Sequence, residues 1–246
     1  MQVSFPSQQQ DISPIKKNGK TIARKTQGRI ISLHAEGDTL SIVDGSEEKN
    51  GVIKAHGEYA ANGGVVWVRY GTFNLYAGTI DASEVVDAGA NGAAIQVNPD
   101  TTFNMYGGKI IGGTSKPAVL KNEETGESYT SGGMGGAIYC QGTINMYKGE
   151  ITGGKVVSAK DHKGQMAGIA GGNIALISKG TMNMYGGKIT GGTVATPDGH
   201  GGNISVRSEG AVLNIKGGEI VNGVSMLQGA NVASWGTITM TGGTIK

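Results

Sequence analysis

The sequence predicts an all-β fold in which short parallel strands stack into a solenoid. A ten-residue phrase recurs along the chain, with copies that begin at positions 71, 101, 142, 180, 211 and 236. Apolar and polar residues alternate within each copy, which indicates strands rather than helices. Glycine contributes 45 of the 246 residues and recurs between the phrases. A repeated unit with connections of variable length is typical of solenoid proteins.

Each repeat is expected to supply three strands. In the third copy, the first strand would run through 138–140, the second through 142–146, and the third would centre on Ile151. Side chains alternate across a strand, so Ile138 and Cys140 would point inward and Tyr139 outward. Trp67 takes the same outward position in an earlier repeat. The same phase assigns the following residues to the inner column: Phe73, Leu75, Phe103, Met105, Ile144, Met146, Met182, Met184, Leu213 and Ile215.

The residue before each third-strand isoleucine bears on how the repeats stack. In chain order these residues are Thr79, Lys109, Glu150, Lys188, Glu219 and Thr244. In a parallel stack they would lie about 4.8 Å apart on one outer face. Opposite charges at neighbouring positions would then stabilise the stack by roughly 0.2–1 kcal/mol per pair. The alternating charges therefore favour parallel neighbours.

The complete prediction is a right-handed parallel β-helix, or β-solenoid, of about seven rungs, with three short strands per rung and insertion loops. The hand follows because nearly all parallel crossover connections are right-handed. Less regular strand patterns occur at 20–23, 28–33, 38–45 and 51–53. We therefore expect one β-helix domain over residues 20–246, preceded by an irregular N-terminal segment or cap over residues 1–19.

Composition and charge argue against several functions. The net charge of +2 is small and spread along the chain, so nucleic acid is not an expected partner. No stretch reaches the roughly 18–20 apolar residues of a membrane span, and the first residues do not have the pattern of a signal peptide. Cys140 is the single cysteine, and at an inward position it is expected to act as an apolar filler.

The last repeat, at residues 236–246, is as regular as the interior ones, and no polar cap follows it. The open end of a parallel stack presents unpaired backbone groups together with the end of the apolar column. We therefore expect further domains to continue the C-terminal end, or a partner to cover it.

Three kinds of segment carry a family resemblance: NGKTI at 18–22, LSIVDG at 40–45, and the repeated NMYGGKI phrases. They resemble the glycine-rich right-handed β-helix domains, related to the pectate-lyase-like superfamily, of secreted or wall-attached proteins of anaerobic Gram-positive bacteria. The resemblance covers residues from about 18 to 246. It implies an extracellular or cell-surface location and a role in adhesion or carbohydrate recognition.

Enzymes of that superfamily resemble one another in paired acidic residues on their strands. The strands of the six regular repeats carry no such pair. The tripeptide Gly199-His200-Gly201 is similar to one element of the polygalacturonases, but the Asn-Thr-Asp, Asp-Asp and Arg-Ile-Lys segments of that pattern are missing. We therefore predict no catalytic residues, and a polysaccharide lyase or glycoside hydrolase is the alternative.

A ladder of tyrosines and asparagines is the first candidate ligand site. Aromatic rings repeated along a flat face resemble platforms for sugar rings, and asparagine amides beside them can donate and accept hydrogen bonds. Stacked tyrosines and asparagines also stabilise parallel strands without a ligand. The candidate residues are Tyr76, Tyr106, Tyr147, Tyr185, Asn104, Asn145 and Asn183.

The insertion loops are the second candidate site. Long insertions at 114–131, 155–170 and 193–200 follow the third strand of successive rungs, so they are expected to project together. Their acids and imidazoles are Glu123, Glu124, Glu127, Asp161, His162, Asp198 and His200. The core of this cluster is Asp161, His162, Asp198 and His200. No spacing matches a metal motif, so no cofactor is predicted. Ca²⁺ is the one ion that these carboxylates could bind. Solvation of surface loops explains the same residues without a ligand.

The function predicted from the sequence is a noncatalytic extracellular module for adhesion or glycan binding within a larger bacterial surface or secreted protein. Its partner would be a polysaccharide or the glycan of a glycoprotein. A structural spacer without any ligand is the further alternative.

Overall fold

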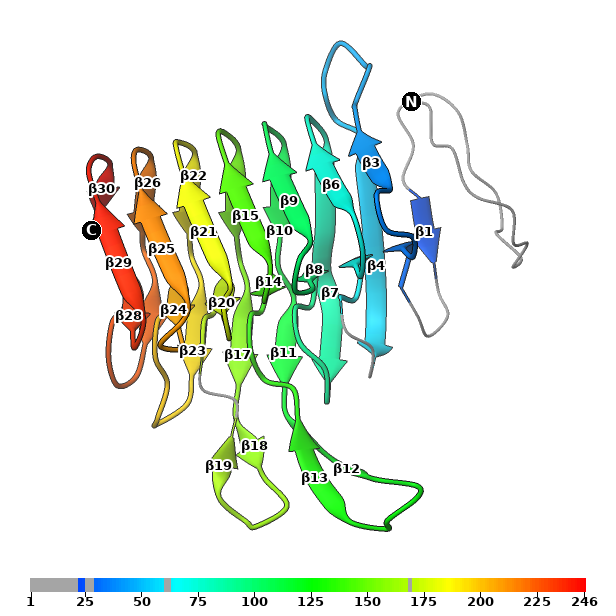
Figure 1. The fold of residues 1–246 in the computed structure, drawn as a ribbon, viewed down its shortest axis with the longest axis vertical. Helices are drawn as coiled ribbons and strands as arrows, with labels where there is room; N and C mark the ends of the chain where they lie inside the picture. The colour runs from blue at the N-terminus through cyan, green and yellow to red at the C-terminus, as the bar shows by residue number, and fades with distance from the viewer. Residues whose placement is uncertain (1–21, 25–28, 60–62, 168–169) are drawn as a thin grey trace.

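The computed structural model describes residues 22–24, 29–59, 63–167 and 170–246. This part of the chain is all-β and contains no helix, and most of its strands belong to three parallel sheets within one body (Figure 1). The predicted cap at residues 1–19 lies outside the described residues, as do positions 20, 21 and 28 of the predicted early strands.

Two of the sheets contain seven strands each. In order across sheet B, the strands are β2 (Ile31–Leu33), β5 (Val66–Val68), β8 (Ile95–Val97), β14 (Ile138–Cys140), β20 (Ile174–Leu176), β24 (Ile204–Val206) and β28 (Val232–Ser234). In order across sheet C, they are β3 (Thr39–Ile42), β6 (Thr72–Leu75), β9 (Thr102–Met105), β15 (Thr143–Met146), β21 (Thr181–Met184), β25 (Val212–Ile215) and β29 (Thr237–Met240).

Sheet A contains twelve strands. They are β1 (Ile22–Arg24), β4 (Val52–Tyr59), β7 (Thr79–Ala88), β10 (Lys109–Ile111), β11 (Thr114–Lys116), β16 (Glu150–Thr152), β17 (Lys155–Val157), β22 (Lys188–Thr190), β23 (Thr193–Ala195), β26 (Glu219–Val221), β27 (Val224–Ser225) and β30 (Thr244–Ile245). From β5 onward the chain passes through sheets B, C and A in turn, and each such pass is called a rung below. This order is compatible with a β-helix.

The predicted inward positions form the core. All ten residues of the predicted inner column are fully buried, and the alternating burial of β9, β15, β21 and β25 follows the predicted phase. Phe73 and Phe103 stack in this column with ring centroids 5.2 Å apart. The third-strand residues Ile110, Ile151 and Ile189 are fully buried as well. The two-residue period was therefore a sufficient guide to the core.

Sheet A differs from the prediction because three rungs form a further strand after the Gly-Gly pairs at 112–113, 153–154 and 191–192. The prediction placed insertion loops from residues 114, 155 and 193, but β11, β17 and β23 begin there and pair in parallel. Gly113 makes the close approach before β11 possible, since a Cβ there would lie 2.4 Å from the Ala82 carbonyl oxygen. The ten-residue β7 spans both halves, pairing with β10 and with β11.

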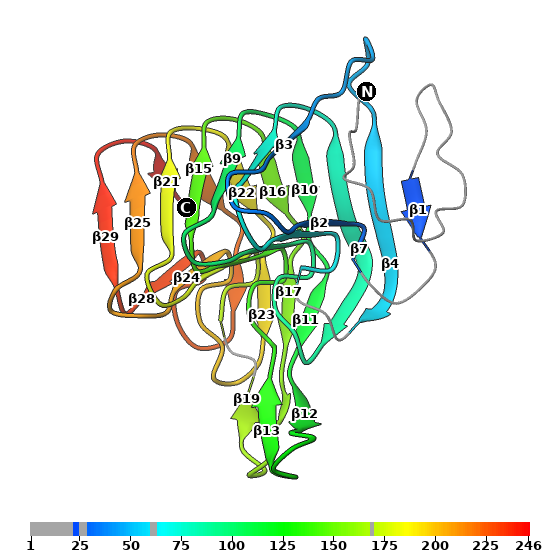
Figure 2. The ribbon, with the colours of Figure 1, turned by 45° about the vertical axis from the view of Figure 1, so that its right-hand side comes forward.

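Two antiparallel hairpins extend from one side of the body (Figures 1 and 2). They are β12 (Ala118–Lys121) with β13 (Ser128–Ser131), and β18 (Ala159–Lys160) with β19 (Met166–Ala167). The third predicted insertion, 193–200, forms no hairpin: its first residues belong to β23, and the rest makes a short turn. Two of the three insertions therefore project together.

Candidate functional sites

The asparagines of sheet C form a hydrogen-bonded ladder. The Asn104 amide nitrogen donates to the Asn74 side-chain oxygen at 2.9 Å, and Asn145 donates to Asn104 at the same distance. The pattern continues through Asn183 and Asn214, again at 2.9 Å. Each interior amide, of Asn104, Asn145 and Asn183, thus donates to one neighbour and accepts from the other, as an in-register parallel sheet allows.

The tyrosines beside this ladder stack face to face. The ring centroids of Tyr76 and Tyr106 lie 4.7 Å apart, those of Tyr106 and Tyr147 5.0 Å, and those of Tyr147 and Tyr185 4.9 Å. The ring planes differ by only 5–13°. The outer side of the stack at Tyr185 faces the Lys216 ammonium, 4.7 Å from the ring centroid. The ring faces that would receive a sugar are thus occupied by one another, and a glycan would meet ring edges and hydroxyls.

The insertion-loop residues separate into two places. Asp161 shapes its own turn, because its Oδ1 accepts from the backbone N–H groups of Lys163 and Gln165. His162 joins the two hairpins: its backbone N–H donates to Thr130 Oγ1 at 2.9 Å, and its Nδ1 lies 3.0 Å from the same oxygen. Within the described residues, no group of three or more His, Cys, Asp or Glu is arranged to hold a metal ion.

His200 and Asp198 lie elsewhere, in the segment that connects β23 of sheet A to β24 of sheet B. His200 belongs to a column of single parallel bridges that links Ala170, His200 and Gln228. The next residue, Gly201, has φ +66°, and a Cβ there would lie 2.2 Å from the Ile204 carbonyl oxygen. This tight turn brings His200 beside β24. The Gly-His-Gly tripeptide is thus explained here by backbone geometry.

The outer face of sheet B gathers residue types that are rare in this chain. The middle residues of its strands stand in register and face outward: Ser32, Trp67, Gln96, Tyr139, Ala175, Ser205 and Ala233. The residue after each strand supplies His34, Arg69, Asn98, Gln141, Ile177, Arg207 and Trp235. Both tryptophans, and all three arginines whose side chains the structure describes, lie on or against this face.

One end of this face is organised around Trp67. The Arg29 guanidinium carbon lies 3.9 Å from the Trp67 ring centroid, and that of Arg69 lies 5.2 Å from it. The indole N–H of Trp67 donates to Asn98 Oδ1 at 3.0 Å, and the Gln96 amide donates to the same oxygen at 2.9 Å. The indole is therefore held by cation–π contacts and a hydrogen bond.

The other end is organised around Trp235, whose side chain is 43% exposed. The Arg207 guanidinium carbon lies 4.5 Å from its ring centroid, and the His200 ring meets it edge-on at 4.7 Å. Burial lowers the pKa of Arg207. Burial also lowers the pKa of His200, the Arg207 charge adds to that effect, and Asp198 opposes it. His200 is thus biased toward its neutral form beside a guanidinium.

This second end holds polar groups without partners. The Ser205 hydroxyl and His200 Nδ1 are buried, and neither has a hydrogen-bond partner among the described residues. Within the same part of the chain, the Arg207 guanidinium has no carboxylate or hydrogen-bond acceptor beside it. A partly buried guanidinium that lacks an acceptor favours an anionic or carbonyl-bearing ligand.

In the middle of the face, the outward side chains are buried, beginning with Tyr139. Its outward position was predicted, yet the side chain is only 8% exposed, and burial raises the pKa of its phenol. Ala175 and Ser205, further along the same column, are fully buried. Part of this outer surface is therefore covered, which the alternation of residues within one strand does not reveal.

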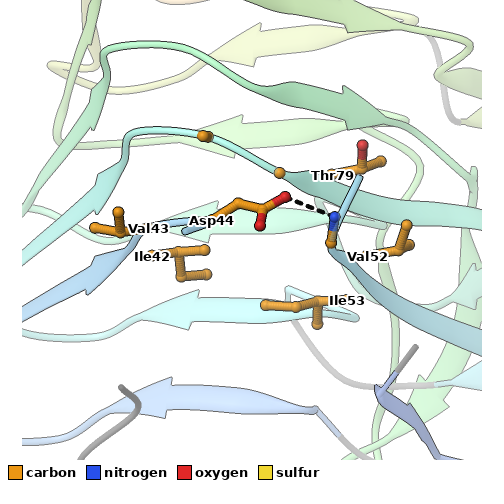
Figure 3. Close-up of a pocket in the computed structure, with 9 residues that line it drawn as sticks. Ile42, Val43, Asp44, Val52, Ile53 and Thr79 are labelled. Atoms are coloured by element: carbon orange, nitrogen blue, oxygen red, sulfur yellow. Dashed lines mark hydrogen bonds between the residues drawn. The ribbon is translucent and has the colours of Figure 1, made fainter. Parts of the chain in front are cut away.

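A small apolar depression lies between β3 and β4, around Asp44 (Figure 3). Asp44 Oδ2 accepts from the Gly51 N–H at 2.6 Å, and Oδ1 accepts from the Ser46 hydroxyl at 2.7 Å and the Ser46 N–H at 3.0 Å. The hydrogen bond from the Ser46 hydroxyl is the main cause that lowers the Asp44 pKa. Both carboxylate oxygens are engaged in closing the loop, so this acid has a structural role.

Cys140 is fully buried, as predicted, and burial raises the pKa of its thiol to about 12. A thiol in this state is not a nucleophile near neutral pH. The described residues include no helix that could span a membrane. Comparison of the chain with protein-family models, with curated proteins and with solved structures found no match.

Proposed function

We propose that this chain is a noncatalytic glycan-binding or adhesion module of a secreted or cell-surface protein, built as a right-handed parallel β-helix of about seven rungs. The cyclic passage through sheets B, C and A supports the β-helix. The resemblance of the repeated phrases to bacterial surface domains supports the location and the general role.

The observation that carries the proposal is the collection of tryptophan, arginine and amide side chains on the outer face of sheet B. Trp67 and Trp235 belong to rungs five strand spacings apart, about 24 Å along the sheet. Aromatic rings supply contact area for sugars, and amides bond to hydroxyl groups. A guanidinium pairs with carboxylate or sulfate in a two-pronged geometry. This combination suits an extended glycan that carries acidic groups.

Arg207 and Trp235 are the proposed anchor of that ligand. Arg207 combines partial burial with the absence of an acceptor among the described residues, and Trp235 keeps much of its indole in solvent. The equivalent pair at the other end of the face, Arg69 and Trp67, would contact a more distant part of the same glycan. The tyrosine ladder of sheet C is the weaker candidate because its ring faces pack against one another.

A polysaccharide-cleaving enzyme has less support. The seven middle positions on the outer face of sheet B contain no aspartate or glutamate, whereas most glycoside hydrolases act through a pair of carboxyl groups. A structural spacer would account for the stacked tyrosines and asparagines, but it gives no reason for a guanidinium without an acceptor.

An array of neutral, uronate-containing and sulfated glycans, run beside an assay for newly formed reducing ends, tests the proposal. We expect binding to acidic glycans without cleavage. Arg207→Gln and Trp235→Ala should each weaken binding about tenfold or more, the usual consequence of losing a charge-assisted or aromatic contact. Lys188→Gln removes a cation from sheet A and is the matched control, which should bind as the parent does.

Unchanged binding by both Arg207→Gln and Trp235→Ala would place the site elsewhere. The double variant Tyr106→Phe/Tyr147→Phe, which keeps both rings, then shows whether the tyrosine hydroxyls contribute. Failure of every glycan to bind would leave the spacer as the better explanation, and release of reducing ends would favour the enzyme.

A further inference from the structure

The stacked tyrosines have a chemical property that does not depend on glycan binding. Tyr106 and Tyr147 lie with their ring centroids 5.0 Å apart and their planes 5° from parallel. Tyr147 and Tyr185 repeat this arrangement at 4.9 Å and 5°. The four ladder side chains are 37–45% exposed, so small oxidants can reach them.

The backbone fixes these rings in register. The Tyr147 N–H donates to the Met105 carbonyl at 2.8 Å, and the Tyr185 N–H donates to the Met146 carbonyl at 2.8 Å. These bonds tie each tyrosine to the strand of the rung before it. Two reacting groups held side by side in this way react as if each were at very high local concentration.

We propose that the tyrosine ladder is a site of oxidative cross-linking, in which a one-electron oxidant such as a haem peroxidase with hydrogen peroxide joins tyrosines of adjacent rungs as dityrosine. Each of two neighbouring phenols gives one electron and one proton to the oxidant. The two phenoxyl radicals form a carbon–carbon bond between ring carbons ortho to the hydroxyls. The hydrogen on each coupling carbon then moves to its ring oxygen, which restores both phenols. One hydrogen peroxide takes up the two electrons and two protons and becomes two waters.

Tyr106 and Tyr147 are the favoured pair. Both are interior members of the stack, so a radical on either ring has a partner on each side. Tyr185 instead has the Lys216 ammonium on its far side, and Tyr76 has the largest angle to its neighbour, 13°. Tyr129, on the β12–β13 hairpin, provides a comparison within the chain. It is 46% exposed and has no aromatic neighbour among the described residues.

The cross-link would act as a covalent staple between rungs. A bond from Tyr106 to Tyr147 closes a long chain segment, and a closed segment has less freedom in the unfolded state. The oxidised protein should therefore unfold at a higher urea concentration than the untreated protein.

The experiment treats the dilute parent chain with peroxidase and hydrogen peroxide, and follows dityrosine fluorescence, intact mass and peptide mass. We expect a monomer that has lost two hydrogen atoms per cross-link. Cleavage after lysine and arginine would release peptide 70–109 joined to 122–148, or 122–148 joined to 180–188. Fragmentation of the joined peptides assigns the linked tyrosines.

Two matched double variants make the result decisive. Tyr106→Phe/Tyr147→Phe keeps the stack and leaves no adjacent pair of phenols in the ladder, so intramolecular dityrosine should be lost. Tyr70→Phe/Tyr129→Phe removes the same number of phenols outside the ladder and should react as the parent does. The parent unfolded in urea should give scattered links.

Three outcomes would overturn the proposal: links that involve Tyr129 in preference to the ladder, products that are only intermolecular, or an undiminished yield from Tyr106→Phe/Tyr147→Phe. Circular dichroism of each variant before oxidation confirms that the comparison is made between folded proteins.

Discussion

At the scale of single residues, the inner column is defined by side chains that reach from one rung to the next. The terminal methyl of Met146 occupies the space that a side chain at Gly187 would need, and Met184 stands in the same relation to Gly218. Methionine suits this position because its unbranched chain adapts to irregular gaps. The column is therefore continuous along the stack. A cavity in one rung also removes packing contacts from the side chains of the adjacent rungs.

Truncation of Met146 to alanine is expected to lower the free energy of unfolding by roughly 2–5 kcal/mol, the usual range for a buried large-to-small change. Thr143→Ala, on the outward side of the same strand, is the control and should change it by less than about 0.5 kcal/mol. Urea denaturation followed by circular dichroism measures both. Equal effects of the two substitutions would contradict the inward assignment of Met146.

The sequence was sufficient for the inner residues but only in part for the candidate sites. Alternation within a strand located Met146, Cys140 and the other inward side chains, because that pattern is local. The contact of Arg207 with Trp235 depends on side chains from consecutive rungs, so it needs the register between distant segments. The equivalent positions of Arg207 and Trp235 after β24 and β28 were a signal in the repeats that the prediction did not use.

At the scale of strands, the charged column of sheet A was correctly predicted. Lys109 pairs with Glu150, Glu150 with Lys188, and Lys188 with Glu219 in parallel register. The Lys109 ammonium lies 3.2 Å from Glu150 Oε1, with both side chains well exposed. The Gly112-Gly113 pair does not end the rung, so the prediction missed β11. These glycines are required by close packing instead: Gly112 lies against Gly154 and Ala137, and Gly113 against Ala82 and Val85.

Reversal of one charge in this column should destabilise the stack. Glu150→Lys would place three lysines at neighbouring positions, which replaces two favourable pairs by two repulsive ones, each worth roughly 0.2–1 kcal/mol. Glu150→Gln removes the attraction without adding repulsion and should cost less. Thermal unfolding at low and at high salt provides the measurement, since salt screens exposed charges. A loss that is the same at both salt concentrations would show that packing, and not charge, is responsible.

At the scale of the whole molecule, the rung formed by β28, β29 and β30 differs from the interior rungs in exposure. Ile238, Met240 and Ile245 are 39–46% exposed, whereas Leu213, Ile215 and Ile220 at the paired positions are fully buried. Strand edges and apolar side chains are thus presented together on one surface. Such a surface favours association with another polypeptide.

We expect the isolated chain to self-associate as its concentration rises, because this surface can pair with a second copy. Ile238→Lys places a charge on the exposed strand β29 and should shift the average mass toward the monomer. Light scattering over a range of concentrations measures the effect, with Val119→Lys on the exposed β12–β13 hairpin as the control. A parent chain that remains monomeric at every concentration would contradict the expectation.

The direction of the backbone hydrogen bonds has a mechanical consequence. Bonds such as Thr181 N–H to the Gly142 carbonyl and Val212 N–H to the Gly180 carbonyl connect one rung to the next, so they point along the stack. Tension applied between the two chain ends would pull along these bonds, and a rung at the end of the stack, which has only one neighbour, would detach first. Because each rung contacts mainly its neighbours, the protein would extend in a series of small steps at modest force. Each step would release one repeat of the polypeptide.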